Sequence, residues 1–218
     1  MRAHCVIWSL AAAVLLLAPP PADATFHLMQ IEQVIGGVDG DTSAQAIQLR
    51  MRFNGQGHVS RGGLVVYDAD GRHPVVLIDF LTDVTPAALG ETILIASPEF
   101  AAHTTPVAVP DFLLTNLIPA SYLAAGSLTY ERDTGAVLWR LSWGGSAYRG
   151  PTSGATTNDR NGDFGRPYPG PLPSTGTEAI EFQGQAIAKS TTNAHDYTLT
   201  DGAAVFTNVE GQSFTVTQ

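Results

Sequence analysis

Apolar and polar residues alternate with a period of two along much of this chain, and this pattern constrains the fold more than any other feature. In the segment QAIQLRMRF, apolar side chains share one side of an extended chain and polar side chains share the other. The apolar side holds Ile47, Leu49, Met51 and Phe53, and the polar side holds Gln48, Arg50 and Arg52. Such alternation is typical of a strand with one side in a core and the other in water. We therefore predict a fold built from strands.

Turn residues separate the apolar segments and predict two hairpins. Asp70-Gly71 lies between GLVVYDADG and HPVVLIDFL, and residues 133–136 lie between GSLTYER and VLWRLSWG. Ser97 before Pro98 predicts one or two helical turns in SPEFAAH, and PASYLAAG is a second candidate helix. TFHLMQIEQVI alternates less cleanly. We expect one all-β domain over residues 25–218, a sandwich or barrel of about ten strands, with a long loop at 144–176.

The first 24 residues have the order of a secretory signal peptide. Arg2 precedes an apolar run from Cys5 to Ala18, a proline break follows, and small residues end at Ala24. The run is shorter than the roughly 20 residues that a membrane-spanning helix needs. We predict cleavage near Ala24 and a secreted protein, periplasmic or extracellular, without membrane insertion.

Composition excludes some classes of function. Cys5 is the only cysteine, so the predicted mature chain has no disulfide and no thiolate nucleophile or ligand. The formal net charge is −9, and Lys189 is the only lysine. An acidic surface without a basic cluster disfavours binding to nucleic acid or to anionic lipid headgroups.

In strand order the chain resembles a bacterial lamin-tail domain. Short motifs spread over nearly the whole predicted mature chain carry this resemblance: MQIEQVIGGVDGD, AIQLRMRFNG, LVVYDADG, ALGETILIAS, LAAGSLTYERDTGAVLWRLSWGG and NAHDYTLTDG. The resemblance implies an immunoglobulin-like antiparallel β-sandwich that serves as an interaction or scaffold module. The chain departs from the family pattern at Gln48, where a glutamate is frequent, and at Leu64, where a tryptophan is common. Asn193 and Asp196 match a late motif whose implied role is structural.

The stretch NDRNGDFG raises the question of a metal site. Asp159, Asn161 and Asp163 present oxygen atoms at alternate positions, as a loop that wraps Ca²⁺ does. Phe164 stands where such a loop has glycine, and Gly170 stands where it has glutamate. Asn, Asp and Gly also favour turns for backbone reasons. Ca²⁺ binding and an ordinary turn therefore both remain open, and no cofactor is certain.

Aromatic residues suggest where a ligand could bind. Trp139 and Trp143 share one side of a strand with apolar neighbours, so we predict that both lie in the core. The ligand-contact candidates Tyr148, Phe164 and Tyr168 fall in the long loop, where we expect exposed rings that bind a ligand or cover the end of the sandwich.

The sequence contains no complete catalytic motif. No His-x-His or His-x-x-x-His pair supports a zinc site. His195-Asp196 could form part of a triad, but Ser146 lies in no nucleophile elbow. We name no catalytic residue and leave enzymatic activity open. We expect a secreted, non-catalytic interaction module that binds an extracellular protein or polysaccharide. A carbohydrate-binding accessory protein or a secreted hydrolase, with Tyr148, Tyr168 and His195 near the site, is the alternative.

Overall fold

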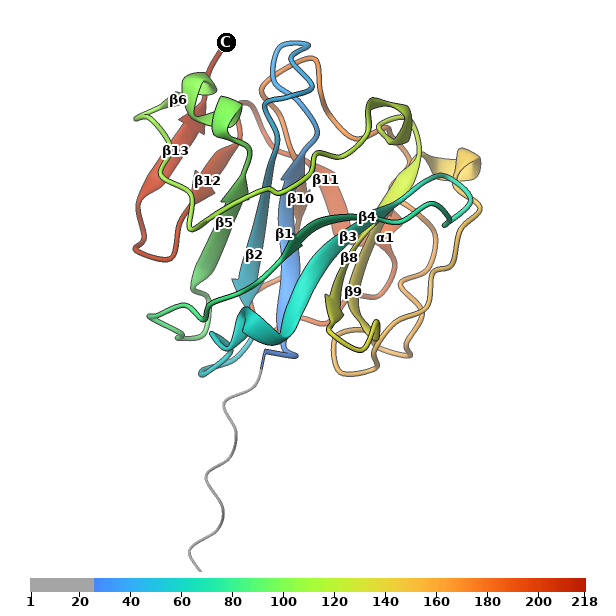
Figure 1. The fold of residues 1–218 in the computed structure, drawn as a ribbon. Helices are drawn as coiled ribbons and strands as arrows, with labels where there is room; N and C mark the ends of the chain where they lie inside the picture. Colours follow the sequence, from blue (N-terminus) through green and yellow to red (C-terminus); the bar gives the residue numbers. More distant parts are fainter. Residues whose placement is uncertain (1–25) are drawn as a thin grey trace, which may run out of the picture.

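The computed structural model describes residues 26–218, and the predicted signal peptide lies outside the described residues. The described chain is all-β, with short helical turns in its connections (Figure 1). The strands are β1 (Met29–Ile35), β2 (Ala46–Met51), β3 (Gly62–Tyr67), β4 (Val75–Asp79), β5 (Thr92–Ala96), β6 (Thr104–Thr105), β7 (Phe112–Leu113), β8 (Gly126–Arg132), β9 (Val137–Trp143), β10 (Ile180–Phe182), β11 (Tyr197–Leu199), β12 (Val205–Thr207) and β13 (Ser213–Val216). The 3₁₀ turns are η1 (Val59–Arg61), η2 (Pro98–His103), η3 (Ala120–Tyr122) and η4 (Gly145–Ala147), and the α-helix α1 spans Asn193–Asp196.

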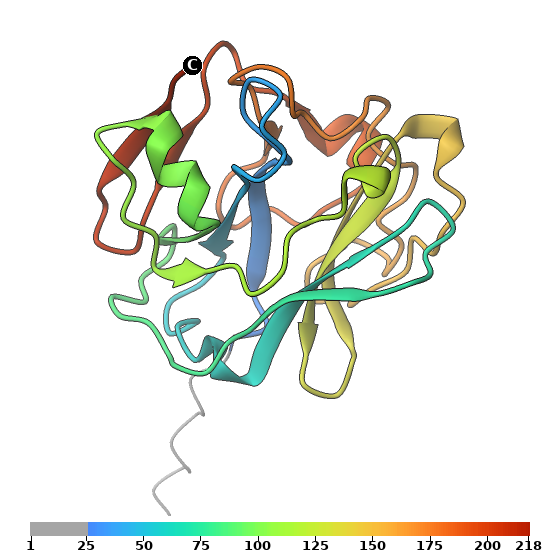
Figure 2. The same cartoon turned by 45° about the horizontal axis from the view of Figure 1, so that its top comes forward.

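The strands form three sheets. A six-stranded sheet has the order β11-β10-β1-β2-β5-β7, a four-stranded sheet has the order β4-β3-β8-β9, and a three-stranded sheet has the order β12-β13-β6. In Figures 1 and 2 the red strands β12 and β13 lie to one side of β5, and β3, β4, β8 and β9 lie on the other side of the molecule. Pairing is antiparallel except between β5 and β7, which are parallel.

The central strands of the six-stranded sheet, β1, β2 and β5, are buried on both faces. One face packs against the four-stranded sheet in the larger core, to which Ile31, Ile47 and Leu49 contribute. The other face packs against the three-stranded sheet and η2 in a smaller core that contains Leu94 and Phe206. Side chains of adjacent residues in a strand point to opposite faces, so each central strand contributes to both cores.

A β-bulge in β1 explains its irregular alternation. Ile31 pairs with Leu49 of β2, whereas Gln33 pairs with Gln48, so Glu32 is the extra residue. The larger core therefore contains Met29 and Ile31 before the bulge and Val34 after it. A strictly alternating strand could not put these three side chains on one face.

The expectation that the polar side of residues 45–53 faces water was wrong. Gln48 and Arg52 are only 3% and 7% exposed, because residues 183–190 and β12 lie over this face. Arg50 forms a 2.6 Å ion pair with Glu32, and Arg52 donates to the carbonyl oxygen of Ala188. Burial is the main cause that raises the pKa of Glu32. Phe53, predicted on the apolar side, lies beyond the end of β2 and is 59% exposed.

Both predicted hairpins and both predicted helical turns are present. β3 pairs with β4 and β8 pairs with β9, and Gly71 and Gly135 adopt positive φ angles in the connecting turns. η2 begins at Pro98, as expected, but the hydroxyl of Ser97 does not cap it. That hydroxyl accepts the N–H of Gln45, the residue before β2. Over residues 26–218, no helix has the length and apolar character needed to cross a bilayer.

Candidate binding site

The long loop at 144–176 packs along β9, the edge strand of the four-stranded sheet. The Nε of Arg140 donates to the carbonyl oxygen of Ser153, and the Nδ2 of Asn158 donates to that of Leu138. Arg140 and Asn158 are both buried. The middle of this loop is therefore part of the folded body, which leaves only parts of the loop free to meet a ligand.

The oxygens of the NDRNGDFG stretch organise its own turn. Oδ1 of Asp159 accepts the N–H groups of Asn161, Gly162 and Asp163 at 2.8, 2.8 and 3.0 Å. Oδ1 of Asn161 accepts the N–H of Asp163, and Oδ1 of Asp163 accepts that of Gly165, both at 3.0 Å. Each of the three candidate ligands thus bonds backbone N–H groups within the loop.

One oxygen of this motif remains unpartnered. Asp159 is fully buried, and its Oδ2 has no hydrogen-bond partner among residues 26–218. Asn161 and Asp163 are exposed, and the Thr152 hydroxyl, followed by the Gly165 N–H, lowers the pKa of Asp163. In the described chain no group of three or more His, Cys, Asp or Glu side chains is arranged to hold a metal. Ca²⁺ binding stays a prediction, with Oδ2 of Asp159 as the atom it most depends on.

The predicted exposure of the aromatic candidates was wrong for two of them. Phe164 is fully buried and packs edge-on against Trp139, with ring centroids 5.5 Å apart. Tyr148 is also buried, and its hydroxyl donates to the carbonyl oxygen of Pro151 at 2.8 Å. Tyr168 is half-buried. Trp139 and Trp143 lie in the core, as predicted. The alternation that places a tryptophan has no counterpart in an irregular loop, so the burial of Phe164 had no sequence signal.

Three segments distant in sequence line an open pocket of about 550 Å³, which we call the loop pocket. They are the η4 turn, visible in gold at the right of Figure 1, residues 166–169, and the start of α1. The lining consists of Gly145, Ser146, Tyr148, Arg166, Pro167, Pro169, Ala194 and His195. It combines apolar ring surfaces with a hydroxyl, a guanidinium and an imidazole.

Backbone hydrogen bonds join the three segments of the loop pocket. The N–H of Gly145 donates to the carbonyl oxygen of Tyr168 at 3.0 Å, and that of Ala194 donates to Arg166 at 2.9 Å. The N–H of Tyr168 in turn donates to Ser142 of β9 at 2.8 Å. The pocket walls are therefore anchored to the sheet rather than carried on a free loop.

Ser146 and His195 line the same pocket, but no catalytic triad is assembled with Asp196. Both oxygens of Asp196 point to residues 190–192: they accept the hydroxyl of Ser190, both the N–H and the hydroxyl of Thr191, and the N–H of Thr192, at 2.6 to 3.0 Å. This carboxylate closes the turn before β11, which agrees with the structural role that the late motif implied. It does not orient the imidazole of His195, as the acid of a triad does.

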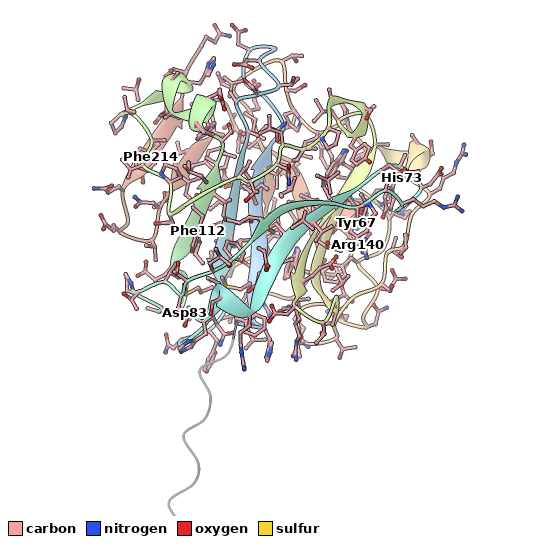
Figure 3. All side chains as sticks on the ribbon, in the orientation of Figure 1. Tyr67, His73, Asp83, Phe112, Arg140 and Phe214 are labelled. Atoms are coloured by element: carbon pink, nitrogen blue, oxygen red, sulfur yellow. The ribbon has the colours of Figure 1, made fainter. Side chains whose placement is uncertain are left out.

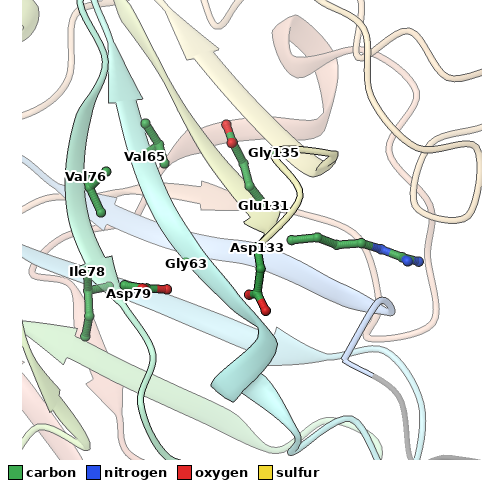
Figure 4. A pocket seen from close by; sticks show the side chains of 9 residues that line it. Gly63, Val65, Val76, Ile78, Asp79, Glu131, Asp133 and Gly135 are labelled. Atoms are coloured by element: carbon green, nitrogen blue, oxygen red, sulfur yellow. The ribbon is translucent and has the colours of Figure 1, made fainter.

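Two smaller hollows also lie on the surface of the described residues. Tyr168 lines one of about 300 Å³ beside the proline-rich residues 170–176, rather than the loop pocket. The other, of about 290 Å³, lies where β3, β4 and the β8–β9 turn meet, and carboxylates of Asp79, Glu131 and Asp133 surround it (Figure 4). The guanidinium of Arg132, next to Asp133, instead lies 5.9 Å from the ring centroid of Phe26.

A buried polar row on the outer face of the four-stranded sheet was not predicted. The hydroxyl groups of Tyr67 and Thr129 both donate to Oε1 of Glu131, at 2.9 and 2.5 Å. Arg140 lies near Tyr67 (Figure 3) and donates to the hydroxyl of Ser127. Burial, followed by the contact with Glu131, raises the pKa of Tyr67 to about 12. Alternation indicated that these residues share a face, but not that the long loop covers them.

Comparison with known proteins assigns no family. No protein-family model matches the chain, and no curated protein sequence matches it.

Proposed function

We propose that this chain is a secreted interaction module, a lamin-tail-like β-sandwich that binds an extracellular polysaccharide through the loop pocket. The observation that carries this proposal is the pocket itself, in which three loop segments anchored to a rigid sheet present unpaired polar groups. Binding residues are commonly found on loops held by a rigid scaffold. The all-β fold and the structural role of Asp196 support the lamin-tail resemblance.

Geometry favours binding over hydrolysis. The hydroxyl of Ser146 and the imidazole of His195 line the pocket without a hydrogen bond to each other, and the carboxylate of Asp196 is occupied elsewhere. Acyl transfer needs a nucleophile that a neighbouring base activates, and a third group must orient that base. Among the described residues, the Ser146 hydroxyl has no such base in this arrangement.

A glycan array and a panel of purified extracellular polysaccharides test this function. Ser146 is exposed, so Ser146→Trp fills the loop pocket from its rim without disturbing the core. We expect the wild-type protein to be retained by at least one polymer and the variant to lose that retention. An esterase and glycosidase panel should give no turnover. Retention that Ser146→Trp leaves unchanged, or catalytic turnover that this variant abolishes, would refute the proposal.

A further inference from the structure

We propose that the loop pocket recognises the carboxylate of an acidic saccharide, such as a uronic acid, and that Arg166 is the residue that binds it. This inference rests on the proposed function, because it specifies the ligand class of the same pocket.

The pocket holds cationic donors without partners. Neither the guanidinium of Arg166 nor the imidazole of His195 has a hydrogen-bond or ion-pair partner in residues 26–218, and no acidic residue lines the pocket. The two nearest acids in sequence are engaged, since Asp163 accepts the N–H of Gly165 and Asp196 accepts groups of residues 190–192. A planar guanidinium matches a carboxylate with two parallel hydrogen bonds, and an imidazole N–H adds a third donor.

The net charge of the protein does not oppose this assignment. The sequence carries −9 overall, but charges further apart than about 8 Å are largely screened at physiological ionic strength. The lining of the pocket contains no acidic side chain, and its basic side chains are those of Arg166 and His195. The local charge therefore decides which ligand is attracted at contact distance.

The lining suits a sugar ring. Pro167, Pro169 and the wall formed by Tyr148 supply apolar surface for the C–H faces of a pyranose, and Ser146 supplies a hydroxyl for its rim. About 550 Å³ lies within the range of small-molecule pockets and accommodates one or two sugar units. Because backbone hydrogen bonds hold the walls in place, binding need not order the backbone, and its conformational-entropy cost falls on the exposed side chains of Arg166 and His195.

A peptide carboxylate fits less well. Peptides bound in extended form depend on main-chain hydrogen bonds. The N–H groups of Gly145, Tyr148 and Ala194 already donate to carbonyl oxygens of the protein, and Pro167 and Pro169 have none. Few main-chain N–H groups of the lining therefore remain for an extended peptide, and side chains are the main polar groups that the pocket offers a ligand rich in hydroxyl groups.

Titration calorimetry with a glucuronate-containing disaccharide and its neutral, carboxyl-reduced counterpart tests the assignment. We expect the acidic sugar to bind at least tenfold more tightly than the neutral one. Arg166→Gln should weaken binding of the acidic sugar about tenfold or more and leave the neutral sugar unaffected, and His195→Gln should weaken it by a smaller factor. Arg160→Gln is the matched control, because Arg160 is an exposed arginine of the same loop outside the pocket. The Arg160→Gln variant should bind the acidic sugar with the same affinity as the wild type.

Further titrations compare the acidic sugar with other anionic ligands. Inorganic phosphate and a peptide with a free terminal carboxylate are titrated alongside, and tighter binding of either than of the uronate would overturn the assignment. Equal affinity for the acidic and neutral sugars, both lost in Ser146→Trp, would overturn it too while the proposed function stands. If no polymer in the array is retained, the proposed function itself fails. Unchanged circular dichroism and melting temperature confirm that Arg166→Gln and His195→Gln remain folded.

Discussion

The hydroxyl of Tyr197 hydrogen-bonds to both of the larger sheets, and removing it tests how these sheets are held together. It donates to the carbonyl oxygen of Ile31 in β1 at 2.6 Å and accepts the indole N–H of Trp139 in β9 at 2.7 Å. Tyr197 lies in β11, is 1% exposed and packs against Phe182. One buried oxygen thus joins the six-stranded sheet, at its bulge, to the four-stranded sheet, and burial raises the pKa of Tyr197 well above its ordinary value.

Replacing Tyr197 with Phe leaves the core shape nearly unchanged, but it leaves the Ile31 carbonyl and the Trp139 indole N–H without a hydrogen-bond partner. Each unsatisfied buried group costs about 1–3 kcal/mol, partly offset because the hydroxyl itself is no longer buried. We expect Tyr197→Phe to lower the free energy of unfolding by about 2–4 kcal/mol. In a Trp139→Phe background only the Ile31 carbonyl loses its partner. Tyr197→Phe should then lower the free energy of unfolding by about 1–2 kcal/mol less than in the wild type.

Urea unfolding, followed by tryptophan fluorescence and circular dichroism, measures these differences. Tyr122→Phe is the control, since the Tyr122 hydroxyl donates to the carbonyl oxygen of His73 in an exposed setting. That change should cost no more than about 0.5 kcal/mol. A cost below about 0.5 kcal/mol for Tyr197→Phe, or the same cost with and without Trp139, would refute the reasoning.

Other expected outcomes concern the polar groups of the loops and of the covered sheet. Burial and Glu131 raise the pKa of Tyr67 from 10 to about 12, so the folded state holds this proton more tightly than the unfolded state. Stability should fall as pH rises through that window, and Tyr67→Phe should remove this part of the fall in urea titrations. Asp196→Ala should lower the free energy of unfolding by about 2–3 kcal/mol, and a loss below about 0.5 kcal/mol would contradict its role in the turn. Calcium at one hundred times its dissociation constant should raise the melting temperature of the wild type by about 5–10 °C but not that of Asp159→Asn. Identical wild-type melting curves in calcium and EDTA would rule out the cation.

Much of the fold could be predicted because it depends on local signals. Alternation and the glycines of the turns identified the hairpins of β3 with β4 and of β8 with β9. The alternation of apolar residues also placed Trp139 and Trp143 in the core. The two-residue strands β6 and β7 were missed, because segments so short show no periodicity and exist only through their partners.

Of the three ligand-contact candidates, Tyr148 lines the loop pocket, Phe164 lies in the core and Tyr168 lines a different hollow. His195, which the alternative function placed near the site, also lines the loop pocket, Ser146 was considered only as a nucleophile, and Arg166 was missed. Nothing in the spacing of residues 146, 166 and 195 indicates that they meet. Their proximity follows from backbone hydrogen bonds between loops, which sequence periodicity does not report.

By itself the sequence determined the strand character of the chain, its main hairpins and some of its core residues, because these follow from side-chain alternation and turn chemistry between near neighbours. Tertiary structure alone decided which polar faces are buried, as for Gln48 and Arg52, and which loop residues enter the core, as for Phe164. The physical reason is that burial of a polar face depends on what another segment lays over it. For Gln48 and Arg52, the covering residues lie more than a hundred positions away in the sequence, and no local pattern encodes this contact.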